Sequence, residues 1–346
     1  MSQHPYKGAP DYRLWRRAMA GRNADQVDPA GGFAWRISPR DRVVTAGSCF
    51  AQHIAQHLRA RGFNYVLTEP PHPSLMEAVA REFQYGVYSA RWGNIYTARQ
   101  LRQLFDRVFG RFCPVDDIWQ QDGAYYDPYR PAIQPGGFAS RAEFVADRVR
   151  HFTACREAFL GMEYFVFTLG LTEGWINRAD GAVYPVCPGT VAGVFYPEQH
   201  LFHDFSVDEI VADFRGFLAG LRAVNAGVKV ILTVSPVPLA ATAKDMDVLQ
   251  ASVLSKSVLR VAAGILAGDE GVAYFPSYEI VTGPQAQNAF EADLRSVSEE
   301  TVERVMRIFF RQVTDAGEVG PVVEAAPVVN AKTAMEVICE EERLGA

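Results

Sequence analysis

The feature that most constrains the fold is the recurrence of short runs rich in β-branched and aromatic residues, separated by longer stretches with helical periodicity. This alternation is typical of a parallel sheet that is covered by helices. We therefore expect an α/β fold in which the runs form parallel strands. The five runs are 43–46, 65–68, 164–169, 228–234 and 272–281.

Helix boundaries can be predicted between these runs. Residues 98–109 place apolar side chains on one helical face after a possible N-cap at Thr97. Capping boxes are expected where a serine is followed three residues later by a glutamate, as at Ser140 with Glu143 and at Ser206 with Glu209. Another strongly periodic helix is expected over 299–313.

The domain organisation follows from changes in composition along the chain. We expect one domain over 41–315, preceded by an N-terminal extension over 1–40. An insertion at about 111–139 interleaves Pro, Gly and Asp with aromatic residues, which either anchor the insertion to the core or stack on a sugar or peptide. We favour anchoring. A C-terminal extension covers 316–346 and is expected to include a short helix over 331–344.

Charge and cysteine content narrow the functional classes. The chain has 346 residues, with 34 Lys and Arg against 40 Asp and Glu, which gives a net charge of −6 and argues against nucleic-acid binding. No apolar run is long enough for a transmembrane helix, and the N-terminus lacks a secretory pattern, so we expect a cytoplasmic protein. Five cysteines without a C-x-x-C pair indicate neither a disulfide framework nor a zinc site, and no cofactor is expected.

Polar residues follow several of the expected strands. Ligands of open parallel sheets bind at the carboxyl ends of the strands, so Ser48, Thr172, Ser235 and Asp293 are expected to gather at one edge. Ser48 lies at a strand-to-helix turn, where a serine is either a nucleophile or the N-cap of the helix. Cys49 is a rival nucleophile, because a helix N-terminus lowers the pKa of a thiol.

The stretch TAGSCFAQHIAQHLRARGF closely resembles the signature of the GSCFA family, which is similar to the SGNH (GDSL-like) hydrolases. Further stretches extend the resemblance from about residue 40 to residue 310, namely GNIYTARQL, FVFTLGLTEGW, ILTVSPVPL, SKSVLR and YFPSYEI. The resemblance implies a flavodoxin-like three-layer α/β/α sandwich with a five-stranded parallel sheet. It also implies acyl-ester chemistry.

The resemblance further implies roles for individual residues. Ser48 matches the nucleophile, whose backbone N–H is also an oxyanion donor, and Gly93 matches the glycine that completes the oxyanion hole, with Gly86 as a competing alignment. Thr172 takes the place of the third-block asparagine. The last block, D-x-x-H, reads Asp293-Leu294-Arg295-Ser296, so the acid is present and serine replaces the histidine.

Without that histidine, another base is needed for Ser48. We take His203 as the candidate base, with His200 and His72 as alternatives, whereas His53 and His57 are assigned to a solvated helix face rather than a metal site. The predicted function is an SGNH-like serine esterase or acyltransferase acting on an O-acylated small molecule, in particular a carbohydrate. The alternative is a catalytically silent protein that binds a glycan or other ligand. A homo-oligomer is left open.

Overall fold

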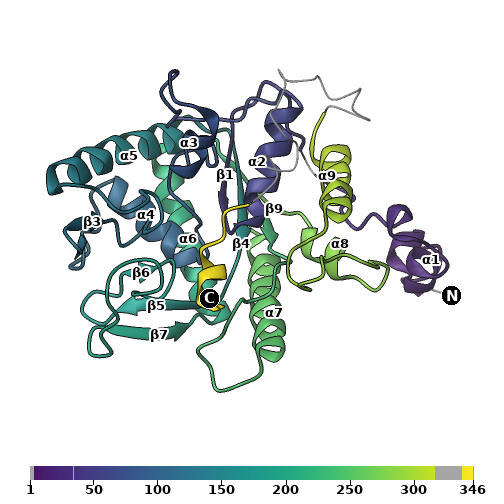
Figure 1. Cartoon of the computed structure of the whole chain (residues 1–346). Helices are drawn as coiled ribbons and strands as arrows, with labels where there is room; N and C mark the ends of the chain where they lie inside the picture. Colours follow the sequence, from purple (N-terminus) through teal and green to yellow (C-terminus); the bar gives the residue numbers. More distant parts are fainter. Residues whose placement is uncertain (1–3, 34, 316–336, 346) are drawn as a thin grey trace.

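The computed structural model describes residues 4–33, 35–315 and 337–345. Its centre is a parallel sheet of four strands in the order β1-β4-β8-β9 (Figure 1). These strands cover Val43–Gly47, Tyr164–Leu169, Lys229–Val234 and Val272–Tyr274. The α/β class with a parallel sheet is therefore confirmed.

Two of the expected strands were predicted wrongly, one entirely and one in its length. The run 65–68 makes only a single parallel bridge, between Tyr65 and Val43, so the sheet has four strands where five were expected. Thr68 donates its backbone N–H to the Ser89 carbonyl and not to a sheet strand. The run 272–281 is a strand only as far as Tyr274, after which Ser277–Thr282 forms helix α8. A short apolar run does not by itself distinguish a strand from a buried helix.

Helices cover both faces of the sheet because alternate strand residues point to opposite sides. On one face, Val44 and Phe165 share a core with helices α4 (Ala98–Val108), α5 (Arg141–Gly161), α6 (Val207–Val224) and α7 (Val248–Leu266). On the other face, Val43 and Val166 pack with α2 (Phe50–Ala60), α8 and α9 (Glu299–Val313). The expected helix at 98–109, the capping box at Ser206 and the helix at 299–313 are confirmed. Ser140 caps α5, but Glu143 accepts from the Ala139 N–H, so the expected capping box is not completed there.

Smaller elements surround this core. Helices η1 (Asp11–Arg13), α1 (Trp15–Met19), η2 (Ala24–Gln26) and α3 (Glu77–Glu82) precede α4. The 111–139 insertion carries a hairpin of β2 (Trp119–Gln121) and β3 (Ala124–Tyr126), with Trp119 buried against Tyr184. A three-stranded antiparallel sheet combines β6 (Val183–Tyr184), β5 (Glu173–Asn177) and β7 (His200–Asp204).

The expected C-terminal helix falls partly outside the described residues. Residues 331–336 are not described, 337–339 are not helical, and Glu340–Gly345 forms the 3-10 helix η3. In Figure 1 this segment, drawn in yellow, crosses the middle of the molecule between α2 and α7.

Among the described helices, α7 alone is long and apolar enough to cross a membrane by length and composition. Helix α7 packs on β8 and β9 and contributes Leu259 and Leu266 to the core. A core helix passes the same length and composition test, so this feature does not indicate a membrane span.

Candidate active site

The turn between β1 and α2 holds Ser48 in a buried position. Gly47 has φ 134°, and a Cβ there would lie 2.3 Å from the Thr168 carbonyl oxygen, so only glycine fits. The Ser48 backbone N–H donates to the same carbonyl at 3.2 Å. The Ser48 hydroxyl is buried and has no hydrogen-bond partner among the described residues. A buried unpaired hydroxyl in a native site requires an explanation.

The segment 93–96 crosses the carboxyl edge of the sheet beside this turn. Ile95 donates its N–H to the Gly47 carbonyl at 2.8 Å, and Gly170 donates to the Tyr96 carbonyl at 3.1 Å. A Cβ on Gly170 would lie 2.8 Å from Ser48 Cβ. The segment therefore bridges the ends of β1 and β4 and closes the backbone around Ser48.

Thr172 lies two residues beyond Gly170, just after the carboxyl end of β4. Thr172 Oγ1 lies 2.6 Å from Asp204 Oδ1 and 3.1 Å from Ser255 Oγ. The Thr172 hydroxyl proton is therefore committed to the Asp204 carboxylate. With the Ser48 N–H also bonded, two of the three expected oxyanion donors already have partners.

A buried lysine is the unexpected member of the site. Lys256 on α7 is 3% exposed, and its Nζ donates to the Gly170 carbonyl at 2.6 Å. Burial lowers its pKa to about 8, although the nearby acid Glu341 acts in the opposite direction. A lysine with such a pKa is partly neutral near pH 8 and can accept a proton.

Asp293 is exposed, and its carboxylate accepts hydrogen bonds from the turn that follows it, residues 295 and 296. Its Oδ1 accepts from the backbone N–H of Arg295 and of Ser296, each at 2.9 Å, and its Oδ2 accepts from Ser296 Oγ at 2.6 Å. Ser296 lines a cleft of about 610 Å³ together with Cys49, His53 and Arg295. The position of the missing histidine thus faces a cleft next to the Ser48 turn.

The histidines proposed as substitutes bond elsewhere. His203 Nε2 lies 2.7 Å from Glu209 Oε1, and His200 Nδ1 accepts the Tyr196 N–H at 3.1 Å. His72 is exposed and bonds Ser74. Within the described residues, no hydrogen bond joins any of these three rings to Ser48.

His53 was assigned to a solvated face, but it is partly buried and lines the cleft beside Cys49. Burial lowers its pKa to about 4, so its ring is neutral near pH 7.

Cys49, the rival nucleophile, is hydrogen-bonded to Cys339 of the C-terminal segment. This bond, together with burial, raises the pKa of the Cys49 thiol, whereas the pKa of Cys339 is lowered to about 6 by the same bond and by Arg295. Cys49 is therefore a protonated thiol and a poor nucleophile at neutral pH.

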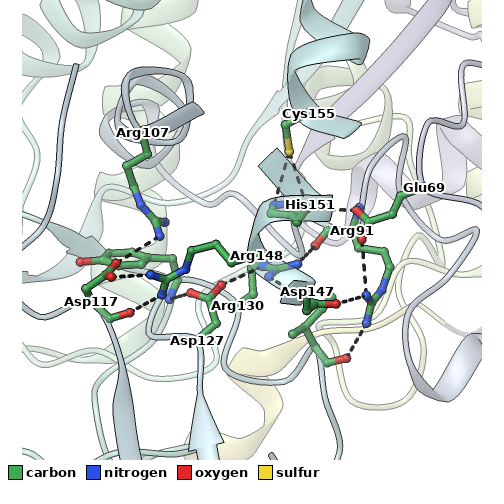
Figure 2. A network of polar contacts seen from close by, with 12 residues as sticks. Glu69, Arg91, Arg107, Asp117, Asp127, Arg130, Asp147, Arg148, His151 and Cys155 are labelled. Atoms are coloured by element: carbon green, nitrogen blue, oxygen red, sulfur yellow. Dashed lines mark hydrogen bonds and ion pairs between the residues drawn. The ribbon is translucent and has the colours of Figure 1, made fainter. Parts of the chain in front are cut away.

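A second constellation has the residue types of a catalytic triad (Figure 2). Cys155 Sγ lies 3.4 Å from His151 Nε2, and His151 Nδ1 lies 3.0 Å from Glu69 Oε2. All three side chains are buried, and burial raises the pKa of Cys155 well above its usual value. The thiol is therefore inert.

The surrounding ion pairs give this constellation a structural role. Arg91 and Arg130 both bond Asp147 at 2.9 Å, and they connect α5 to two loops that precede it in the chain (Figure 2). We assign the network to fixing these loops. Within residues 4–33, 35–315 and 337–345, no group of three or more His, Cys, Asp or Glu side chains is arranged to hold a metal ion.

Sequence reasoning missed Asn94, Tyr96 and Lys256 as site residues. Signals for them existed, because Asn94 and Tyr96 lie in GNIYTARQL and Lys256 lies in SKSVLR, two stretches that were noted only as family blocks. The contribution of residues 337–345 had no such signal.

Comparison with known proteins identifies one family. The sequence profile of the GSCFA family matches residues 42–309, which is most of the chain. Among curated proteins, none matches. A solved structure of a carbohydrate esterase family 3 protein from Talaromyces cellulolyticus is similar at 10% identity, covering 78% of this chain and 94% of its own, with a TM-score of 0.33.

Proposed function

The chain belongs to the GSCFA family, and on this premise we propose that it is a serine acyl esterase or acyltransferase whose nucleophile is Ser48. The observation that carries the proposal is the buried, unpartnered Ser48 hydroxyl at a strand-to-helix turn, enclosed by Gly47 and Gly170. A hydroxyl in this position is weak until a base removes its proton.

We assign the proton acceptor to Lys256 in place of His203. Lys256 Nζ is bonded to the carbonyl of Gly170, the residue that contacts the Ser48 side chain. Lysine serves as the base for serine in known Ser-Lys variants of the triad, and burial tunes its pKa for this role. The two groups would act in direct contact or through one water.

The oxyanion would be stabilised by donors on the 93–96 segment. The expected Gly93 N–H is joined there by Asn94 Nδ2 and Tyr96 OH, which already bind a carboxylate of the chain. Each well-placed oxyanion donor contributes on the order of a hundredfold or more to the rate.

The reaction has two balanced steps. Ser48 Oγ bonds to the acyl carbon as its proton passes to neutral Lys256, and the alcohol then leaves with that proton. Water, or a second alcohol in the acyltransferase case, next attacks the acyl-serine while giving its proton to Lys256. Ser48 recovers a proton as it leaves, and the product is a carboxylic acid or a new ester.

The substrate that we propose is an O-acylated carbohydrate. The cleft of about 610 Å³ beside Cys49 and Ser296 lies within the size range of small-molecule sites. Its polar lining includes Arg295 and Glu291, which suit a hydroxyl-rich ligand.

The experiment measures hydrolysis of p-nitrophenyl acetate and of acetylated sugars, together with fluorophosphonate labelling of Ser48. Ser48→Ala should abolish both readouts, and Lys256→Met should lower the rate by at least about 100-fold, the scale of a lost general base. Ser257→Ala and Lys229→Met, which alter an exposed serine of α7 and a lysine of β8, are matched controls that should keep the rate.

Two outcomes would redirect the proposal. Loss of activity in His203→Gln, with retention in Lys256→Met, would return the base to His203. Inactivation by a thiol reagent that persists in Ser48→Ala would assign the chemistry to Cys49.

A second candidate function is that of a catalytically inactive protein that binds a glycan in the cleft. The observation that favours it is that Ser296 replaces histidine while the Ser48 N–H and Thr172 hydroxyl are already bonded. Tight binding of an intact acetylated glycan, with no turnover and no labelling of Ser48, would establish this candidate and refute the esterase.

A further inference from the structure

The described C-terminal segment, residues 337–345, lies across the site although its sequence is strongly acidic. Glu340 and Glu341 are only 6% and 5% exposed, and Cys339 is also buried. Burying a carboxylate is costly unless it is bonded and paired. The buried carboxylates of the segment must therefore be bonded or paired by the groups that surround them.

The backbone of the segment is recognised first. Gln52 on α2 accepts the Ile338 N–H at 2.9 Å and donates its side-chain N–H to the Ile338 carbonyl at 2.8 Å. Asn94 Nδ2 donates to the same carbonyl at 2.8 Å. Two side-chain amides thus hold the backbone of a single residue, Ile338, in a fixed orientation.

The Glu340 carboxylate is recognised next, by the donors assigned above to the oxyanion. Its Oε2 accepts a hydrogen bond from Asn94 Nδ2 and another from Tyr96 OH, the latter at 2.9 Å. Its Oε1 lies 4.0 Å from the position that a Cβ on Gly93 would occupy. A carboxylate in this position resembles the carboxylic acid product of ester hydrolysis.

The rest of the segment is held by an ion pair with Arg295 and by the hydrogen bond between Cys339 and Cys49. Arg295 Nη2 lies 3.2 Å from Glu341 Oε2 and donates to Cys339 Sγ at 3.5 Å. Lys256 and Glu341 attract one another, and Cys339 is hydrogen-bonded to Cys49. Residues of α2, α7 and the 293–296 turn therefore converge on one short peptide.

We propose that residues 337–345 are an intramolecular ligand of the Ser48 site, with the Glu340 carboxylate in the place of the substrate acyl group. The inference rests on the proposed function for its inhibitory consequence, because an ester and Glu340 compete for the same donors. The segment must leave before substrate binds, so the apparent affinity for an ester is reduced by the fraction of molecules in which the site is open.

The test uses the full chain with Glu340→Ala, and Glu342→Ala as the matched control, because Glu342 is 60% exposed and its 3.5 Å ion pair with Arg295 is screened by solvent. A fluorescein-labelled peptide, VICEEERLGA, is titrated against each protein and followed by fluorescence anisotropy. We expect it to bind the Glu340→Ala variant at least about tenfold more tightly than the wild type or the control, because its own segment no longer fills the site. The same peptide carrying glutamine at the Glu340 position should bind more weakly.

Equal binding of the peptide to wild type and Glu340→Ala, or no binding to either, would overturn the inference. Thermal unfolding of the variants checks that they fold, and amide hydrogen exchange across 337–345 provides a second measurement. Faster exchange in Glu340→Ala than in Glu342→Ala supports the inference, and equal exchange contradicts it.

Measuring ester hydrolysis in these variants distinguishes the failure of this inference from the failure of the proposed function. A rise of at least about tenfold in kcat/KM for p-nitrophenyl acetate in Glu340→Ala, reversed by added peptide, supports both. Selective peptide binding without turnover in any variant would refute the esterase and retain the intramolecular ligand. Turnover that is equal in wild type and Glu340→Ala would refute the inference and retain the esterase.

Discussion

Gly170 is packed against Ser48 so closely that a Cβ on Gly170 would lie 2.8 Å from Ser48 Cβ and 3.1 Å from the Tyr96 carbonyl oxygen. These neighbours belong to the buried edge of the sheet, so neither can move without disturbing the β1 and β4 termini. A methyl group at Gly170 would therefore displace the nucleophile or the segment that carries the oxyanion donors.

We expect Gly170→Ala to lower the free energy of unfolding by about 1 to 3 kcal/mol, the usual cost of overpacking, and to reduce fluorophosphonate labelling of Ser48. Gly227→Ala is the control, because a Cβ at Gly227 meets no atom within 4 Å. Urea unfolding and labelling are measured on both variants. Wild-type labelling in Gly170→Ala would show that the contact does not position Ser48.

The sequence was sufficient to predict the central sheet and the main helices because their signals are local. Buried β-rich runs identified β1, β4 and β8, and serine caps identified the starts of α5 and α6. The run at 65–68 has the same composition, but its contact with β1 ends after Val66, which donates its N–H to the Val43 carbonyl, because Thr68 bonds to Ser89 instead. The composition of a run does not determine which groups its backbone will hydrogen-bond.

The site was predicted less completely because its chemistry comes from contacts between distant segments. Ser48 was identified from its place after a strand, but nothing local to SKSVLR indicates that Lys256 would be buried against Gly170. The pairing of Gln52 with Ile338 joins residues 286 positions apart. No periodicity or spacing predicts such a contact, so the C-terminal segment was assigned to an extension.

The pH dependence of the proposed reaction follows from Lys256. The base must be neutral to accept the Ser48 proton, and burial lowers the pKa of Lys256 to about 8. We expect kcat/KM to rise with pH and to level off above about pH 8. A pH series in Lys256→Met should lose this rise. A flat wild-type profile between pH 6 and 9, at a measurable rate, would exclude Lys256 as the base.

The buried network of Figure 2 predicts a large effect on stability. Arg91 lies between Glu69 and Asp147, and both Arg91 and Glu69 are almost fully buried. Arg91→Met removes the cation and leaves two carboxylates without it, so we expect a loss of about 3 to 5 kcal/mol in the free energy of unfolding.

Urea unfolding at pH 7 measures this loss. The control is Arg17→Met, whose exposed pair with Asp11 should contribute at most about 1 kcal/mol. Similar small changes in both variants would show that the network of Figure 2 does not hold α5 to its loops.

Ser296→His tests whether the cleft retains the geometry of D-x-x-H. Asp293 Oδ2 already accepts a hydrogen bond from Ser296 Oγ, and Ser296 lines the cleft with Cys49. An imidazole at this position would bond Asp293 through one nitrogen, which raises the pKa of the ring, and present the other nitrogen to the cleft. In the Lys256→Met background, we expect Ser296→His to raise the rate at least about tenfold, because a general base contributes on the order of 100-fold or more.

The rescue should depend on the carboxylate, so the triple variant Asp293→Asn, Ser296→His, Lys256→Met should lose it. Ser296→Gln in the same Lys256→Met background is the control for side-chain size, because an amide cannot serve as the base. The restored activity should also rise with pH at a midpoint above the usual histidine value of about 6.5, because the Asp293 carboxylate raises the pKa of the ring. Equal rates for the glutamine and histidine variants would show that the imidazole does not reach Ser48, and that this chain's cleft differs from the D-x-x-H arrangement in geometry as well as in sequence.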